Sequence, residues 1–216
     1  MVSRRIQAVV SEISGNVLAD IGTDHGYIAI EALRAGRVSR AILCDINKGP
    51  LQRAAENIAA EGLSDCAEVR LGNGLAPLKP TEADCISIAG MGGMLLCEIL
   101  RDGAEVLQTA ERLVLQPQLD IHTVRKFAHS AGFIIADEHM IYEGRFYTIM
   151  RCERGSEAEY SIAEYAFGKH LIERKDDVLK QYLQYRIAEC EKILRMHEVA
   201  EVIKEKDMCG EVLACL

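Results

Sequence analysis

Several residue patterns are missing from the 216-residue chain, and each absence removes a class of protein. No apolar run is long enough to cross a membrane, and residues 1–5 lead into an amphipathic segment rather than the apolar core of a signal peptide. We therefore expect a soluble, cytoplasmic protein with no membrane partner. The eight cysteines contain no Cys-x-x-Cys pair, and several lie inside apolar runs, which favours buried thiols over zinc ligands or disulfides. We expect no bound metal.

Positive charge is also in the minority. The chain has 25 lysines and arginines against 33 acidic residues, for a net charge of -8. This balance argues against indiscriminate binding of nucleic acid, which needs a basic surface. It still allows an enzyme that docks one RNA through a local basic patch. Because the chain has no tryptophan, any stacking on a base has to use tyrosine, phenylalanine or histidine.

The most informative stretch of the chain is Asp20-Ile-Gly-Thr-Asp-His-Gly-Tyr27, which follows a short apolar run. An apolar run that ends in an acid, followed by Gly22, Gly26 and a helix-like segment, predicts a strand, a tight loop and a helix. Loops of this kind at the end of a first parallel strand bind nucleotide-like ligands. Asp24 stands where the second glycine of Gly-x-Gly-x-x-Gly belongs, which argues against an NAD-dependent dehydrogenase.

Further strands alternate with helical segments, which predicts a parallel α/β sheet with right-handed crossovers. The expected strands are 17–21, 41–45, 67–71, 84–89 and 112–115. Two more, at 133–142 and 146–152, predict an antiparallel hairpin at the sheet edge. Polar or glycine-rich residues follow the parallel strands, where open α/β sheets bind their ligands. These residues are Gly22–Gly26, Asp45, Asn73, Gly90–Gly93 and Gln116–Gln118.

The residues at each of these strand ends have two interpretations, one in which they bind a ligand and one in which their role is only structural. Asp45 either accepts hydrogen bonds from both hydroxyls of a ribose or is an exposed strand end or helix cap. Asn73 either reads the edge of a base or belongs to a turn. The glycines of residues 90–93 mean that a ligand comes close to the backbone or that the turn is unusually tight. Pro117 is expected to fix a turn, and its neighbour Gln116 either contacts a ligand or ends the loop.

The composition changes after residue 154. Ser161 and Glu164 fit a capping box that opens a helix. Between Gly168 and Gly210 there is neither glycine nor proline, and apolar residues recur at helical spacing, which predicts a coiled-coil-like long helix or helical hairpin. This appendage either packs or dimerises, or it serves as an arm for RNA. The expected domains are residues 1–154 and residues 155–216.

These loops resemble those of class I S-adenosylmethionine (SAM) methyltransferases, and more narrowly those of the bacterial family that methylates N1 of adenine 22 in tRNA. The resemblance covers nearly the whole chain. Its most specific part is Ala89-Gly-Met-Gly-Gly93, because most methyltransferases acting on adenine N6 carry an Asn/Asp-Pro-Pro-aromatic motif there. The other matching stretches are Asp20–Tyr27, Gly72–Leu75 and Leu115–Pro117. Two positions depart from common patterns: Asn73 replaces an acid, and Asp45 replaces the longer Glu.

The resemblance implies a Rossmann-like sheet, SAM as cofactor, tRNA as partner and a role for each strand end. The implied cofactor-binding residues are Asp20, Gly22, Gly26, Asp45, Ile46, Asn73, Gly74, Ala89 and Gly90. Asp24 is the expected catalytic residue because a carboxylate stabilises the cationic methylated base. His25 either accepts a proton or orients a partner, or it only fixes the loop. The expected substrate-binding residues are Tyr27, Met91, Gly92, Gly93, Gln116, Arg5 and Arg34.

For the RNA backbone we expect a basic rim formed by Arg4, Arg5, Arg34, Arg37 and Arg40, with further basic residues on the C-terminal arm. A monomer is favoured. Two alternatives stay open. One is a SAM-dependent methyltransferase that acts on another RNA or on a small molecule. The other is a SAM-binding scaffold that transfers no methyl group, since a fold by itself does not fix a function.

Overall fold

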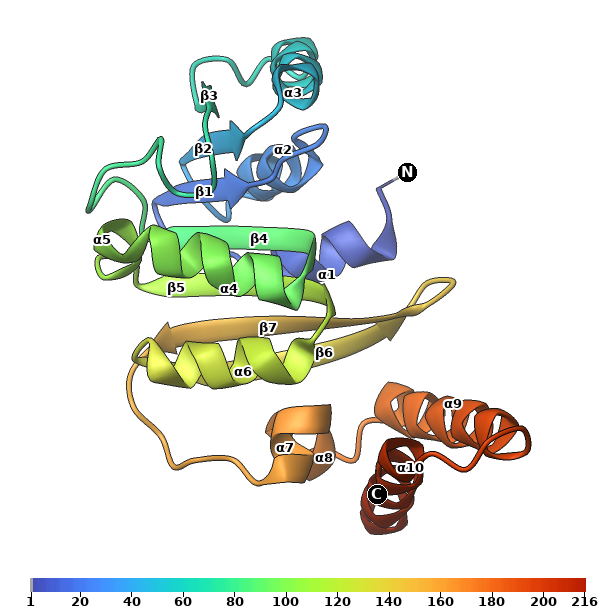
Figure 1. The fold of residues 1–216 in the computed structure, drawn as a ribbon. Coiled ribbons are helices and arrows are strands. Elements are labelled where there is room, and N and C mark those ends of the chain that lie inside the picture. The colour runs from blue at the N-terminus through green and yellow to red at the C-terminus, as the bar shows by residue number, and fades with distance from the viewer. Residues whose placement is uncertain (1) are drawn as a thin grey trace.

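In the computed structural model, which describes residues 2–216, seven strands form one sheet with helices on both faces (Figure 1). The strands are β1 (Val17–Ile21), β2 (Arg40–Asp45), β3 (Ala67–Leu71), β4 (Cys85–Gly92), β5 (Arg112–Leu119), β6 (Phe133–Tyr142) and β7 (Phe146–Arg154). Their order is β3-β2-β1-β4-β5-β7-β6. The first five strands are parallel, and β7 runs antiparallel to both β5 and β6. The predicted Rossmann-like sheet with an antiparallel edge hairpin is therefore confirmed.

Helices cover the two faces of the sheet in separate groups (Figure 1). The helices before the C-terminal segment are α1 (Arg4–Glu12), α2 (Tyr27–Arg34), α3 (Lys48–Ala60), α4 (Gly93–Asp102), α5 (Ala104–Leu107) and α6 (Ile121–Ser130). One buried cluster joins α4, α5 and α6 to one face of the strands, and a second joins α1, α2 and α3 to the other. Neighbouring strand residues enter opposite clusters, as Leu18 and Ala19 do, because side chains of a strand alternate between its faces.

The strands β4 and β5 run further than the sequence pattern indicates. They stay paired beyond Ala89, through irregularities on either side of Met91, until Gly92 lies opposite Leu119. The expected turn at Pro117 is therefore wrong, since Pro117 lies inside β5, opposite Met91. Irregular pairing accommodates a proline, which has no N–H to donate to a regular ladder.

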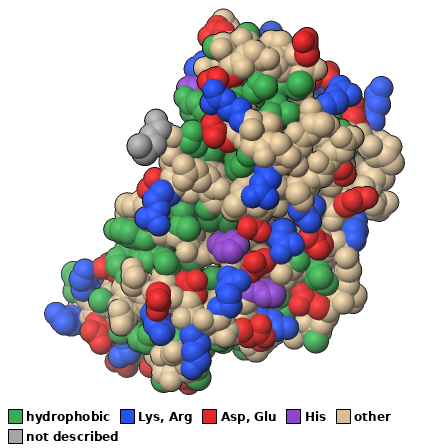
Figure 2. All heavy atoms as spheres, turned by 180° about the vertical axis from the view of Figure 1, so that it is seen from behind, with side chains coloured by type: hydrophobic (Ala, Val, Ile, Leu, Met, Phe, Trp, Pro, Cys, Tyr) green, Lys and Arg blue, Asp and Glu red, His purple; other side chains and the backbone are tan. Residues whose placement is uncertain are grey.

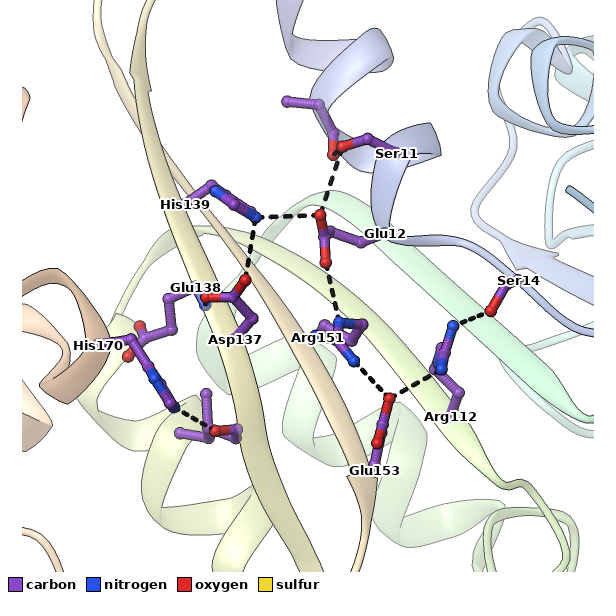
Figure 3. Close-up of polar contacts among 12 residues, drawn as sticks. Ser11, Glu12, Ser14, Arg112, Asp137, Glu138, His139, Arg151, Glu153 and His170 are labelled. Carbon is purple, nitrogen blue, oxygen red and sulfur yellow. Dashed lines mark hydrogen bonds and ion pairs between the residues drawn. The ribbon is translucent and has the colours of Figure 1, made fainter. Parts of the chain in front are cut away.

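The C-terminal end of α1 is held against the hairpin of β6 and β7 by a group of ion pairs (Figure 3). One carboxylate oxygen of Glu12 lies 3.0 Å from His139 Nε2, and the other accepts a 3.0 Å hydrogen bond from Arg151. Asp137 lies 3.5 Å from the same histidine nitrogen. The hydrogen bond between Glu12 and His139 lowers the pKa of Glu12 and raises the pKa of His139. On the face of the molecule seen from behind, acidic and basic side chains are interspersed (Figure 2).

The N-terminal end of α1 is held by the loop of the same hairpin. The carboxylate of Glu143 accepts hydrogen bonds of 3.0 and 3.1 Å from the backbone N–H groups of Arg4 and Arg5. These N–H groups have no partner inside the helix, so a side chain or water has to satisfy them. The two attachments fix α1, and with it the side chain of Arg5, relative to the sheet.

The C-terminal segment is helical, as predicted, and Ser161 and Glu164 form the predicted capping box. Its helices are α7 (Ile162–Phe167), α8 (Lys169–Glu173), α9 (Asp177–Leu194) and α10 (Ala200–Cys215). Since α9 and α10 are separate helices that pack on each other, the chain forms the helical hairpin rather than one long helix. The coiled-coil character stays a prediction. Among residues 2–216, no helix is both long enough and apolar enough to span a bilayer.

A buried ion pair joins this segment to the sheet. Arg125 of α6 and Glu138 of β6 approach to 2.7 Å, and their side chains are 1% and 0% exposed. Arg125 also donates hydrogen bonds of 2.7 and 3.1 Å to the backbone oxygens of Tyr165 and Ala166 in α7. Since a charge inside a protein needs partners of this kind, this group of residues fixes where α7 lies on the sheet.

All eight cysteines are free thiols, and most are buried, as the sequence predicts. Burial raises the pKa of Cys44 and of Cys85 to about 12, so both thiols stay protonated near neutral pH. They pack as small hydrophobic residues.

Candidate active site

A cavity of about 410 Å³ opens at the C-terminal ends of β1 and β4. It is lined by residues 20–28, by Ala89 and Gly90, by Arg5 and Ile6 of α1, and by Gln118 of β5. Its volume falls in the range of sites for small ligands, roughly 300–1,000 Å³. The position also agrees with the rule that open α/β sheets bind ligands beyond the carboxyl ends of their strands.

Asp20 forms a buried, acidic part of the cavity wall. Burial raises the pKa of its carboxyl group to about 6, and the negative charge of nearby Asp45 adds to the increase. Ionisation of Asp20 therefore carries a desolvation cost. A ligand that brings a positive charge or hydrogen-bond donors to this carboxylate would lower its pKa again.

The loop between β1 and α2 requires glycine at positions 22 and 26, because both have a positive φ and neither has room for a Cβ. Gly22 has a φ of +73°, and a Cβ there would collide with the side-chain end of Met91. Gly26, at the start of α2, has a φ of +74°, and a Cβ would lie 3.1 Å from Leu43. The N–H groups of Gly22 and Thr23 donate hydrogen bonds of 2.8 and 3.2 Å to the carbonyl of Cys44, which holds the loop to the end of β2.

Asp24 lies at the cavity wall between two basic side chains. Arg53 of α3 donates a 3.0 Å hydrogen bond to one carboxylate oxygen, and His25 Nε2 lies 3.3 Å from the other. The rings of His25 and Tyr27 stack at 5.3 Å with 19° between their planes. Asn57, also on α3, donates a 2.9 Å hydrogen bond to the backbone oxygen of His25. The structure thus brings Asp24, His25 and Tyr27 together.

Sequence reasoning missed both contributions from α3. Arg53 and Asn57 lie 29 and 32 residues from their partners in the loop. In the sequence they look like ordinary polar residues on an exposed helix. Only the packing of α3 beside the loop shows what they contact.

The glycine-rich stretch contributes less to the cavity than the sequence predicts. Gly90 lines the cavity with a φ of +81°, and a Cβ there would face Arg5 Nη1 at 3.6 Å and Gln118 Nε2 at 3.8 Å. Gly92 and Gly93 are not among the lining residues. A Cβ on Gly93 would lie 2.6 Å from the backbone oxygen of Leu119, so this glycine permits close packing of α4 against β5.

Gln116 supports the cavity from behind rather than lining it. Its side chain is fully buried, and its Oε1 accepts a 3.0 Å hydrogen bond from Arg5 Nη1. Its Nε2 donates a 3.1 Å bond to the backbone oxygen of Pro117. The amide therefore orients Arg5, and Gln118 is the glutamine that faces the cavity. Residues two apart in a regular strand share a face, so the different surroundings of Gln116 and Gln118 follow from the irregular pairing of β4 and β5 around Met91 and not from simple alternation.

Four predicted cofactor residues lie at the same edge of the sheet but outside this cavity. Asp45 accepts a 2.7 Å hydrogen bond from the backbone of Asn47, and Ile46 is exposed. Asn73 and Gly74 line a separate cavity of about 130 Å³ beside α4. Gly74 has a φ of +53°, and a Cβ there would lie 2.8 Å from Ile99.

Arg34 is not brought to the site. It is the last residue of α2, at the end of the helix that lies away from the cavity, and it pairs with Glu31 and Glu61. The paired charge of Arg34 does not support its predicted contact with substrate.

Comparisons with known proteins agree with this arrangement. The sequence model of the family described as tRNA (adenine(22)-N(1))-methyltransferase matches residues 18–213. The tRNA (adenine(22)-N(1))-methyltransferase of Bacillus subtilis (strain 168) is 36% identical over 190 residues, which cover 84% of this chain and 80% of that protein.

Solved structures extend the similarity to the whole chain. Streptococcus pneumoniae Sp1610, in complex with S-adenosyl-L-methionine, is 34% identical, with a TM-score of 0.91 over 99% of this chain and 100% of that chain. M. capricolum TrmK, in complex with S-adenosyl-homocysteine, is 26% identical, with a TM-score of 0.88 over 100% of this chain and 99% of that chain. With a family match across most of its length and relatives of this similarity, the chain belongs to the family of tRNA (adenine(22)-N(1))-methyltransferases.

Proposed function

We propose that this protein is a methyltransferase that uses SAM to methylate N1 of adenine 22 in tRNA. The observation that carries the proposal is the cavity at the ends of β1 and β4, where Gly90 leaves the backbone open toward Arg5 and Gln118. This cavity occurs in a chain that belongs to the family whose Bacillus subtilis member is named for this reaction.

The residues present fit the cofactor. When bound, SAM supplies an electrophilic methyl group on a positively charged sulfur. Buried Asp20 offers a carboxylate to a donor or cationic group, and the positive φ angles of Gly22 and Gly26 let the loop turn tightly along the cavity wall. We assign these three residues, with Ala89 and Gly90, to cofactor binding. Further along the same sheet edge, Asp45, Ile46, Asn73 and Gly74 complete the proposed set.

The chemistry requires little more of the protein than alignment. The N1 atom of adenine has a lone pair in the plane of the ring, so no proton has to leave before it attacks a methyl group. The base has to be taken out of its stack or pair and held in line with the methyl group. Gly90 lets a flat base approach the main chain, while Arg5 and Gln118 offer hydrogen-bond donors beside it. Tyr27 is half exposed at the wall and supplies an aromatic surface.

Methylation leaves a positive charge on the base, and Asp24 is the carboxylate we assign to stabilise it. Its side chain is 69% exposed, so one side stays accessible to substrate. Arg53 and His25 hold the carboxylate in one orientation, at the cost of part of its negative potential. His25 thus positions Asp24, and the reaction needs no proton acceptor.

The wider organisation of the protein follows from the same proposal. We propose that residues 1–154 bind SAM and carry out the reaction, and that residues 155–216 form an arm that contacts tRNA. A monomer presents both parts to one tRNA. Since tRNA is a cytoplasmic substrate, we assign the protein to the cytoplasm.

The test is transfer of labelled methyl from SAM to unmodified tRNA transcripts with A or G at position 22. Label found only in the A22 transcript, as 1-methyladenine, would support the proposal. Equal labelling of both transcripts would support methyltransferase activity but contradict adenine 22 as the methylated nucleotide. If no tRNA is labelled although SAM binds, the protein acts on another substrate or is a SAM-binding scaffold.

A further inference from the structure

Two arginines share one aromatic ring at the outer side of the cavity. Arg145, in the loop of the β6–β7 hairpin, donates a 2.9 Å hydrogen bond to the hydroxyl of Tyr147, and its guanidinium lies 5.0 Å from the ring centre. The guanidinium of Arg5 lies 5.8 Å from the centre of the same ring. Both distances are within the range of a cation–π contact.

Neither guanidinium is neutralised by an acidic side chain. Among residues 2–216, no carboxylate oxygen lies within 4.0 Å of a guanidinium nitrogen of Arg5 or Arg145, while eight other arginines take part in such pairs. Glu143, close to both, already accepts the two backbone hydrogen bonds at the start of α1. In a chain with eight more acidic than basic residues, two unpaired arginines on one ring form a local positive site.

The position of the pair connects it to the proposed reaction. Arg5 lines the cavity and faces the position of a Cβ on Gly90, while Arg145 is exposed on the hairpin loop beyond it. The hairpin loop projects on the side of the sheet where β1 and β2 end (Figure 1). The positive site therefore extends outward from the place where the target base would be held.

We propose that Arg145, together with Arg5 and Tyr147, binds a phosphodiester of the substrate RNA next to the nucleotide that enters the cavity. This inference rests on the proposed function, and it adds Arg145 and Tyr147 to the residues that contact tRNA. A guanidinium offers several N–H donors in one plane, which suits phosphate oxygens. The Tyr147 ring restricts both arginines before RNA arrives, which reduces the entropy lost on binding.

The test compares the variant Arg145→Gln with the wild-type protein in binding to unmodified tRNA at several salt concentrations. We expect affinity to fall about tenfold at low salt, and the slope of log K against log[salt] to become shallower by about 0.7 to 1, as for one lost phosphate contact. SAM affinity stays unchanged. Arg101→Gln is the matched control, since Arg101 is exposed, lies 5.7 Å from the centre of the Phe127 ring, forms no ion pair within residues 2–216 and stands in the last turn of α4, outside the cavity.

Two further variants separate charge from geometry. Arg145→Lys should keep most of the salt slope and lose part of the affinity, because it keeps the charge without the planar donors. Tyr147→Phe removes only the hydroxyl that accepts from Arg145 and should weaken tRNA binding by a smaller factor.

Wild-type affinity and slope in Arg145→Gln would overturn the inference. So would a loss confined to SAM affinity, which would assign the arginines to the carboxylate of the cofactor. The binding measurement needs no turnover, so its result stays separate from that of the methylation assay. Binding of A22 tRNA with no methylation would count against the proposed function and leave the phosphate contact standing.

Discussion

Arg53, on α3, donates a 3.0 Å hydrogen bond to the carboxylate of Asp24, whose other oxygen lies 3.3 Å from His25 Nε2. The contact links a helix after the second strand to the loop after the first. It keeps the Asp24 carboxylate oriented although most of its surface is exposed. A carboxylate fixed in this way stabilises a developing positive charge with little reorganisation.

Replacement of Asp24 with asparagine keeps the shape of the side chain and removes its charge. Asp24→Asn should therefore lower kcat by about 10²-fold, a size typical of a lost electrostatic contact in a transition state, and change SAM affinity little. Single-turnover methylation and SAM titration measure the two effects. Asp65→Asn, an exposed residue in the turn before β3, serves as control. Full turnover in Asp24→Asn would remove the assigned role.

A substitution at Gly22 tests the cofactor loop. Gly22→Ala places a methyl group where the side chain of Met91 lies and strains a backbone with φ of +73°. SAM affinity should fall by more than about tenfold, and Met91→Ala in the same chain should restore part of it by removing the collision. Gly36→Ala carries a similar strain, with φ of +62° and no atom near the new methyl group. It should cost about 1 kcal/mol in stability and leave SAM binding unchanged. Equal SAM affinities in both alanine variants would contradict this assignment.

The parallel sheet could be predicted from the sequence because apolar runs and intervening helices carry a strong local signal. The strand β1 was predicted at Val17–Ile21 and found there. The extension of β4 and β5 could not be predicted from the sequence, since the glycines and Pro117 are typical of a turn. Only the pairing between the two strands keeps these residues extended.

The residues of the candidate site could likewise be predicted only where the sequence carries a local signal. Asp20, Gly22 and Gly90 were identifiable because their position at strand ends has a local signature. Arg53 and the separate roles of Gln116 and Gln118 depend on which elements pack together, and sequence spacing does not encode that. The substrate contact expected of Arg34 stays a prediction, and the sequence did not reveal that this arginine pairs with Glu31 and Glu61.

The pair of Glu12 and His139 should make stability depend on pH. The folded-state pKa of His139 is raised above its usual 6.5, so its contribution is complete below pH 6.5 and is lost as pH rises through the raised value. The pKa of Glu12 is lowered below 4.5, so its contribution is lost only as pH falls through that lower value. Stabilisation by the pair is therefore greatest between about pH 4.5 and 6.5.

Urea unfolding of wild type and His139→Gln at pH 5.5 and 8.5 measures this effect. The two proteins should differ more at pH 5.5, by up to about 1 kcal/mol, because the histidine is partly exposed and solvent screens the pair. Asp137 and Arg151 also face the pair, and Arg174 opposes the charge on His139. His197→Gln, an exposed histidine between α9 and α10, is the control and should show no such difference. A difference that is the same at both pH values would exclude titration of His139 as its source.

The buried pair of Arg125 and Glu138 gives the largest expected change in stability. Arg125→Met leaves the Glu138 carboxylate buried without its partner and removes two hydrogen bonds to the backbone of α7. The free energy of unfolding should fall by about 3–5 kcal/mol, as for other buried pairs that lose one member. Adding Glu138→Leu should recover part of this loss, because the unpaired charge is then gone.

The same substitution separates the ion pair from the docking of the C-terminal helices. The double variant still lacks the donors to Tyr165 and Ala166, so its α7 should be held less firmly than in the wild type. Limited proteolysis should therefore cut residues 155–160 faster in both variants, although the double variant unfolds at a higher urea concentration than the single one. Arg195→Met, at an exposed arginine after α9, should match the wild type in both measurements. If the double variant regained wild-type resistance to proteolysis, the hydrogen bonds to α7 would not be what holds the helical segment on the sheet.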